Sequence, residues 1–224
     1  MHILLKIKHK ASNKKRLGSI FILKKEIPLG KKFDPGYYCE DDLKDEGFRK
    51  LGKNVKIAKN CTIIGANNIS IGDNVRIDGF SSIIALGNGY VTIGSFVHIG
   101  GYCILTGGEG IIMNDFSGLS HGVQIYSRAD DYSGNHLTNP TIPRNYTKIN
   151  RGTVCLERHV IIGAGSVILP NIAIGEGSAV GALSLVNKNL APWGIYFGCP
   201  ARKLKNRSKK LLELEKQLMD ELKQ

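Results

Sequence analysis

The sequence predicts an all-β protein built as a parallel β-helix, with a short helical segment before it and a helix after it. The first observation is a period of six, since an aliphatic residue returns at every sixth position between 154 and 186, usually beside a small residue. Neither an α-helix nor an ordinary strand has this period, so the segment is a repeat. The second observation is the 27 glycines, which favour many tight turns over long helices.

Residues 1–50 predict a basic arm followed by a short helix. Residues 1–33 are rich in lysine around an apolar strip at 20–23. Such a strip suits a peripheral contact with the anionic surface of the inner membrane, and a solvated arm partly docked on the body is the alternative. Residues 34–50 predict a turn and a short helix whose Leu43 and Phe48 face the core.

The six-residue repeat occupies residues 51–202. Three hexapeptides form one triangular coil, and the aliphatic side chains of successive coils stack inside it as a column. The position four residues later also faces inward, near a corner, where a small side chain fits; Cys61 and Cys103 are therefore small core residues. The predicted column comprises Leu51, Ile57, Ile63, Ile71, Ile77, Ile83, Ile93, Ile99, Leu105, Met113, Leu119 and Ile125, then Leu156, Ile162 and the positions that follow to Val186.

The repeat stops at 127–153 and ends at 202. A gap of this length in so regular a body predicts a functional loop. Beyond the repeat, the leucines of residues 203–224 fall on one helical stripe. This stripe predicts an amphipathic helix that packs on its own body or on a neighbouring subunit.

Charge and cysteine usage narrow the class of protein. The net charge of +12 indicates an anionic partner, either a phosphorylated ligand or a membrane surface. No nucleic acid is expected, because no motif or aromatic platform accompanies the charge. The five cysteines contain no CxxC pair, and no apolar run reaches the ~18 residues of a membrane-spanning helix, so we expect reduced thiols in a cytoplasmic protein.

Several stretches of the chain resemble a known family. These are the hexapeptide pattern and the segments GFRKLGKNVKI, DDYSGNHLTNPTIP, HVIIGAGSVILP and GALSLVNKNLAPWGIYFGCPARKLK. They resemble the hexapeptide-repeat acyltransferases, and more closely the galactoside O-acetyltransferase-like enzymes of O-antigen, lipopolysaccharide and capsule synthesis. The resemblance implies a left-handed β-helix, a homotrimer, and acetyl-CoA as donor in the groove between adjacent β-helices.

The resemblance also implies a general base in the loop after the coil that ends at Ile125. The related enzymes carry a histidine there, whereas this chain has Asp130 and Asp131. Either carboxylate is a candidate base, or a group that orients one, and the alternative is a simple turn, because DDYSGN has turn composition. His121, two residues beyond an inward leucine, is the other candidate base, with an exposed turn histidine as its alternative.

The remaining candidates concern binding. For CoA, the resemblance implies small residues along the pantetheine arm and polar or cationic residues beyond it. For the acceptor, Tyr102 would replace the asparagine that the family has where this chain has Gly100, and His136 lies in the loop. The expected CoA-binding residues are Ala164, Ala182, Asn187, Lys188, Arg202 and Lys205.

These residues support transfer of an acetyl group from acetyl-CoA to a sugar hydroxyl. The alternative acceptor is the amino group of a nucleotide-linked amino sugar, because a neutral amine is a good nucleophile that needs only weak base catalysis. A β-helix scaffold without activity is a third possibility. A zinc hydratase would need three histidines at one metal; the spacing of His98, His121 and His159 does not match, so no metal is predicted.

Overall fold

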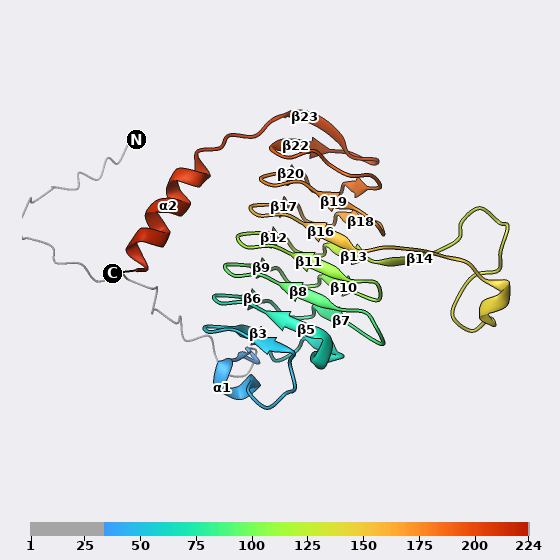
Figure 1. Cartoon of the computed structure of the whole chain (residues 1–224), viewed down its shortest axis with the longest axis horizontal. Helices are drawn as coiled ribbons and strands as arrows, with labels where there is room; N and C mark the ends of the chain where they lie inside the picture. Colours follow the sequence, from blue (N-terminus) through green and yellow to red (C-terminus); the bar gives the residue numbers. More distant parts are fainter. Residues whose placement is uncertain (1–33, 224) are drawn as a thin grey trace, which may run out of the picture. The chain divides into compact units, whose positions relative to one another are not determined.

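The computed structural model describes residues 34–223, which form a parallel β-helix of triangular coils (Figure 1). Each coil contributes one strand to each of three sheets, here called sheets B, A and C in the order in which the chain visits them. Sheets B and C have six strands each, so the body contains six complete coils. The handedness is left, as the family resemblance implied, which is an exception to the usual right-handed crossover.

Sheet A carries nine strands, ordered β1 (Tyr37–Tyr38), β3 (Lys56–Ala58), β6 (Arg76–Ile77), β9 (His98–Ile99), β12 (Gly118–Leu119), β17 (Ile161–Ile162), β20 (Ala179–Val180), β22 (Gly194–Phe197) and β23 (Arg202–Asn206). Sheet C contains β4 (Thr62–Ile64), β7 (Ser82–Ile84), β10 (Ile104–Thr106), β13 (Gln124–Tyr126), β18 (Val167–Ile168) and β21 (Leu185–Val186). Sheet B contains β2 (Lys50–Leu51), β5 (Ile69–Ile71), β8 (Val91–Ile93), β11 (Ile111–Met113), β16 (Val154–Leu156) and β19 (Ala173–Ile174).

The predicted aliphatic column is the core. In sheet A, for example, Ile77, Ile99, Leu119 and Ile162 are paired in register from coil to coil, and each is at most 1% exposed. Burying such a side chain contributes about 1.5–3 kcal/mol. The period of six therefore identifies the residue of each strand whose side chain faces the core.

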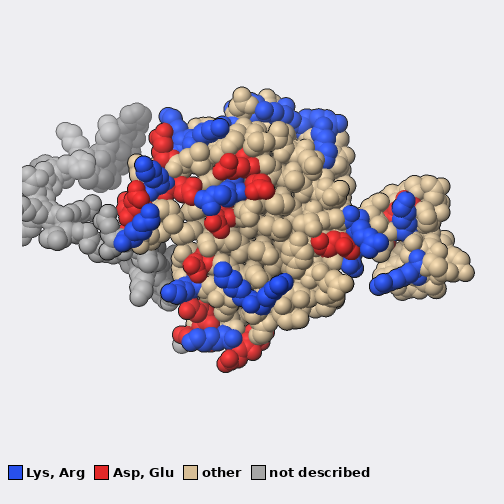
Figure 2. All heavy atoms as spheres, viewed as in Figure 1, with Lys and Arg blue, Asp and Glu red and all other residues tan. Residues whose placement is uncertain are grey.

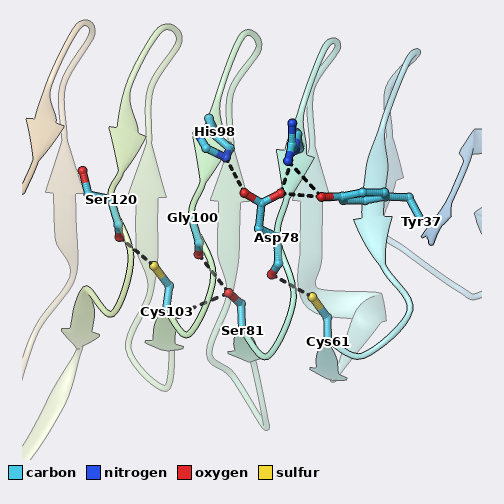
Figure 3. Close-up of polar contacts among 9 residues, drawn as sticks. Tyr37, Cys61, Asp78, Ser81, His98, Gly100, Cys103 and Ser120 are labelled. Carbon is cyan, nitrogen blue, oxygen red and sulfur yellow. Dashed lines mark hydrogen bonds and ion pairs between the residues drawn. The ribbon is translucent and has the colours of Figure 1, made fainter. Parts of the chain in front are cut away.

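The small inward residues near the corners have a second role, because they bond to the next coil. The Ser81 hydroxyl donates to the carbonyl oxygen of Gly100 at 3.0 Å, and the Cys103 thiol lies 3.2 Å from the carbonyl oxygen of Ser120 (Figure 3). Burial raises the pKa of the Cys103 thiol to about 11. This thiol is therefore protonated at neutral pH and serves as a packed corner residue, as predicted.

The N-terminal end is closed by helix α1 (Glu40–Leu43) and strand β1. Leu43 is buried and Phe48 packs against the core, as predicted. The Tyr37 hydroxyl donates to the Asp78 carboxylate at 2.8 Å, and the same carboxylate binds Arg76 and His98 (Figure 3). The predicted membrane-contacting arm, residues 1–33, lies outside the described residues.

The C-terminal segment differs from the prediction of a helix from residue 203. Residues Arg202–Asn206 form β23, which pairs antiparallel with β22, and helix α2 begins only at Leu211 and ends at Glu221. The last strand of a sheet leaves backbone groups that need partners, and β23 supplies them. Glu215 anchors α2 to the body through Arg158 and through His159, whose ring nitrogen lies 2.7 Å from the carboxylate. Neither helix in residues 34–223 is long and apolar enough to cross a membrane.

The long loop is an insertion between two coils that leaves the sheets continuous. Strand β11 pairs directly with β16, and β13 pairs with β18. The ends of the loop are joined, because the Gly152 amide donates to the Ser127 carbonyl oxygen at 3.0 Å. Between them, β14 (Arg128–Asp130) and β15 (Ile149–Arg151) form an antiparallel hairpin that projects from the body, with 3-10 turns at Arg144–Tyr146 here and at Ala66–Asn68 in the body (Figure 1).

Candidate active site

The first group of predicted residues lies on one edge of the β-helix, the A–C corner, where the chain turns from sheet A into sheet C. His121, Ala164 and Ala182 occupy the same place in three consecutive coils, and all three are exposed. Tyr102 lies one coil below His121, where it stacks on Phe80 with ring centroids 4.9 Å apart. His121, Ala164 and Ala182 therefore form a straight track along the corner, with the histidine at one end and the exposed Leu183 beside the other.

The other end of the track is cationic. The Gly198 amide bonds to the Ser184 hydroxyl, and the Leu185 amide bonds to the Gly198 carbonyl, so the turn before β23 sits on the A–C corner. Arg202 and Lys205 then follow on β23, and both are exposed. Lysine and arginine side chains gather over the end of the body that carries β22 and β23 (Figure 1 and Figure 2). The corner therefore suits a long, thin ligand that carries negative charge at one end.

The second group lies on the hairpin, which leaves the C–B corner where sheet C turns into sheet B. Asp131 stabilises the hairpin through hydrogen bonds of its side chain. Its carboxylate accepts bonds from the Ser133 amide at 2.9 Å, from the Ser133 hydroxyl at 2.9 Å, and from the His136 ring at 2.7 Å. The bonds from Ser133 and then from His136 hold the pKa of Asp131 down at about 2. Asp131 and His136 are therefore parts of one loop structure, and Asp131 is a poor proton acceptor.

Asp130 has a different environment. It lines a groove of about 950 Å³ between the hairpin and the body, together with Leu185 and Asn187. One of its carboxylate oxygens accepts the Asn139 amide at 3.3 Å, and the other has no hydrogen-bond partner within residues 34–223. Asp131 therefore shapes the loop, whereas Asp130 is half-buried and lines the groove.

The two groups do not meet within one copy of the chain. His121 and the alanines lie at one edge of sheet C, and the hairpin leaves from its other edge. Asn187 and Lys188, expected with the CoA residues, lie at the C–B corner on the side of the hairpin. Between the two edges, the six strands of sheet C contain no Asp, Glu, Lys, Arg or His. A face without charge separates the two halves of the predicted site.

Ser120, which was not among the predicted site residues, precedes His121 at the A–C corner. Asp78, Gly100 and Ser120 hold equivalent positions in three successive coils (Figure 3). Ser120 therefore lies one coil beyond Gly100, the position at which the family resemblance implied an asparagine. Within residues 34–223 no three His, Cys, Asp or Glu side chains come together as a metal site.

The fold and the similarity to known proteins define an acyltransferase of the left-handed β-helix class, with a CoA thioester as donor. No family model matches the chain. The chain is 44% identical over 179 residues to dTDP-4-amino-4,6-dideoxy-D-glucose acyltransferase of Escherichia coli, which covers 80% of this chain and 93% of that protein. The chain therefore belongs to the hexapeptide-repeat acyltransferase family.

Solved structures agree with this assignment. The N-acyltransferase AntD of Bacillus cereus, in complex with dTDP and 3-hydroxybutyryl-CoA, superimposes with a TM-score of 0.81 at 47% identity, covering 84% of this chain and 99% of AntD. AntD variants in which a serine, or an aspartate ten positions further on, is replaced have also been solved. A putative lipopolysaccharide O-acetyltransferase of E. coli K12 is less similar, with 26% identity over 75% of this chain and 93% of its own length.

Proposed function

We propose that this protein transfers an acyl group from acyl-CoA to the amino group of a dTDP-linked 4-amino-4,6-dideoxy sugar. The observation that carries the proposal is the identity of 44–47%, over nearly the full length of the relatives, to proteins described as acting on or binding this acceptor. The expectation of a sugar hydroxyl as main acceptor is thereby replaced by the alternative, the amine.

The chemistry of an amine fits the hairpin. A neutral amine attacks the thioester carbonyl carbon, and the nitrogen loses a proton as the carbon–sulfur bond breaks. Asp130 is the proposed proton acceptor, because one of its oxygens is uncommitted whereas the carboxylate of Asp131 is fully bonded. A carboxylate is a weaker base than histidine, and that is adequate for the nitrogen of an amine but poor for a hydroxyl.

Sequence spacing also supports Asp130. Ser120 is the only serine in this chain that is followed by an aspartate, Asp130, ten residues later. The same spacing separates the serine and the aspartate that were replaced in AntD. We therefore assign Asp130 and Ser120 to the reaction site, with His121, which follows Ser120 on the same corner, as the second candidate base.

The donor is proposed to lie along the A–C corner. Ala164 and Ala182 leave room for the pantetheine arm to run close to the backbone. Arg202, opposite Phe197 at the end of the track, and Lys205, further along β23, attract the CoA phosphates. The thioester would then lie near Ser120 and His121.

Two copies of the chain are needed to complete this site, and we propose a homotrimer. The A–C corner of one subunit would face the hairpin of the next, with uncharged sheet C in the contact. Asn187 and Lys188 would then face the neighbour's CoA. Mixing an Asp130→Asn subunit with an Ala182→Trp subunit tests this, because a shared site regains activity in mixed trimers. If each copy held a whole site, the mixture would stay inactive.

The test of the function is direct acylation. The purified chain is supplied with dTDP-4-amino-4,6-dideoxyglucose and either acetyl-CoA or 3-hydroxybutyryl-CoA, while thiol release and product mass are followed. The expected product carries one acyl group on nitrogen, and dTDP-glucose gives none. Acylation of dTDP-glucose at a comparable rate would return the assignment to O-acylation. A cytoplasmic location, where both substrates and reduced thiols occur, is part of the proposal.

A further inference from the structure

A second groove lies at the base of the hairpin and was not foreseen from the sequence. Its volume is about 470 Å³, and it shares three residues with the groove that contains Asp130. The residues that line it are Glu109, Arg128, Arg144, Thr147, Lys148, Ile149 and Arg151. The two grooves therefore adjoin at these three shared residues.

The side chains that line this groove carry more positive charge than negative charge. Arg128 and Arg151 are paired directly across the two strands, a placement that costs energy when the charges are alike. Both rely on one carboxylate, since Arg128 lies 2.8 Å and Arg151 lies 3.9 Å from the same oxygen of Glu109. A single negative charge therefore serves two facing arginines.

Two further cations in the groove have no partner of opposite charge among residues 34–223. Arg144 and Lys148 are exposed, and neither forms an ion pair with any residue in the described part of the chain. The groove thus holds four cations against one carboxylate. A ligand with two adjacent negative charges would relieve this repulsion, and arginine is suited to bind such groups through paired bonds.

The distance from the cations to the proposed base suits the acceptor. Arg128 and Asp130 lie two residues apart on one strand and so point to the same face, about 7 Å apart along it. Ile149, which pairs with Asp130, lines both grooves. Arg151 pairs with Arg128 and so lies about as far from Asp130 along the hairpin. A phosphate held by Arg151 would therefore have a sugar ring's length between it and Asp130.

We propose that this cationic groove binds the diphosphate of the nucleotide-sugar acceptor, an inference that rests on the proposed function. Arg144, Lys148 and Arg151 hold the phosphates, while Arg128, fixed to Glu109 and to the Gly108 carbonyl, sets the position of the strand. The cations on β23 serve the donor instead. The two anionic substrates are thereby bound by separate sets of cations on different edges of the β-helix.

The experiment uses the double variant Arg144→Gln/Lys148→Gln, which leaves the Arg128–Glu109 contact in place. Binding of dTDP and of CoA is measured by calorimetry, alongside acceptor KM. We expect the Kd for dTDP and the acceptor KM to rise about tenfold or more, with the Kd for CoA unchanged. A matched control, Lys50→Gln/Lys216→Gln, removes two exposed cations elsewhere and should change neither constant.

The outcomes separate this inference from the proposed function. If the wild-type protein acylates the dTDP-amino sugar but the double variant binds dTDP normally, only the diphosphate site is wrong. A loss of CoA affinity in its place would assign the groove to the donor and also overturn the inference. If the wild-type protein neither binds dTDP nor turns over the amino sugar, the proposed function fails and the inference fails with it. Thermal unfolding of each variant serves as the control that the fold is retained.

Discussion

The A–C corner and the hairpin are built in opposite ways. At the corner, Ala164 and Ala182 take their places from the repeat itself, because each coil stacks in register on the one before. The hairpin stands outside the repeat, and its shape depends on a few polar bonds around Asp131.

In the proposed function this difference separates the two halves of the chemistry. Recognition of the donor is proposed to lie on the coils that also form the core, so it is tied to the fold. Recognition of the acceptor is proposed to lie in an insertion that contributes no residue to the buried core. The donor half should therefore tolerate few changes in shape, whereas the acceptor half should respond to changes in charge and hydrogen bonding.

The largest expected effect comes from removing the proposed base. Asp130→Asn keeps the shape of the side chain but removes its ability to accept a proton, so we expect kcat to fall by about a hundredfold or more. Steady-state kinetics at saturating substrates, with CoA affinity by calorimetry as control, measure this. Asp131→Asn and His136→Ala should act more weakly, through the shape of the loop. A greater loss with either of them would move the reaction away from Asp130.

The next largest effect is expected from a bulky side chain on the proposed CoA track, which should weaken CoA binding. Ala182→Trp places a large side chain on the exposed corner, and we expect the Kd for CoA to rise by about thirtyfold or more, since each 1.4 kcal/mol of lost contact or clash is a factor of ten. Ala173→Trp is the matched control, because Ala173 is also exposed but lies on sheet B. Equal losses in both variants would mean that the coils, and not the track, are damaged.

A smaller effect is expected at the cationic end of the track. Arg202→Ala removes one exposed charge, worth about 1 kcal/mol to a bound phosphate, and so should weaken CoA binding about fivefold. The melting temperature should not change, because the Arg202 side chain makes only a 3.4 Å contact with its neighbour's carbonyl. An unaltered Kd would remove Arg202 from the donor site.

The smallest effect concerns the hairpin in acid. The pKa of Asp131 is lowered from 3.8 to about 2, so its ionised form favours the ordered loop. This stabilisation is complete above about pH 4 and is lost as the pH falls through 2. Amide signals of Ser133 and Asn135 in NMR spectra should therefore shift toward those of a disordered loop over that range. Asp131→Asn should abolish the pH dependence, and a transition that survives this change would come from another group.

The core could be predicted from the sequence because its spacing is imposed by the coil. Every sixth residue faces inward, so Ile99 or Leu119 can be placed without knowledge of any partner. The predicted start of the C-terminal helix was wrong, because it depends on a pairing partner that local spacing does not reveal. Leu204 continues the leucine stripe, yet the backbone of β22 requires a pairing strand, and tertiary pairing outweighs local spacing.

The candidate site was only partly predictable. DDYSGN indicates a turn at the right place, but which aspartate bonds to Ser133 depends on the path of the hairpin in three dimensions. His121 and Asp130 are near in sequence, yet the chain between them runs along β13 to the other edge of sheet C. The absence of the family histidine did favour an amine, because the choice of base depends on the nucleophile and not on the fold.

The way in which the hairpin leaves the body has a consequence for the history of the family and for engineering. The chain leaves the body at Ser127 and returns at Gly152, and one backbone hydrogen bond joins these two residues. The sheets of the body remain continuous across the insertion. We expect such a segment to be exchangeable between homologues without loss of the coils. Because the proposed acceptor site lies on it, the exchange should change the acceptor and leave the proposed CoA track in place.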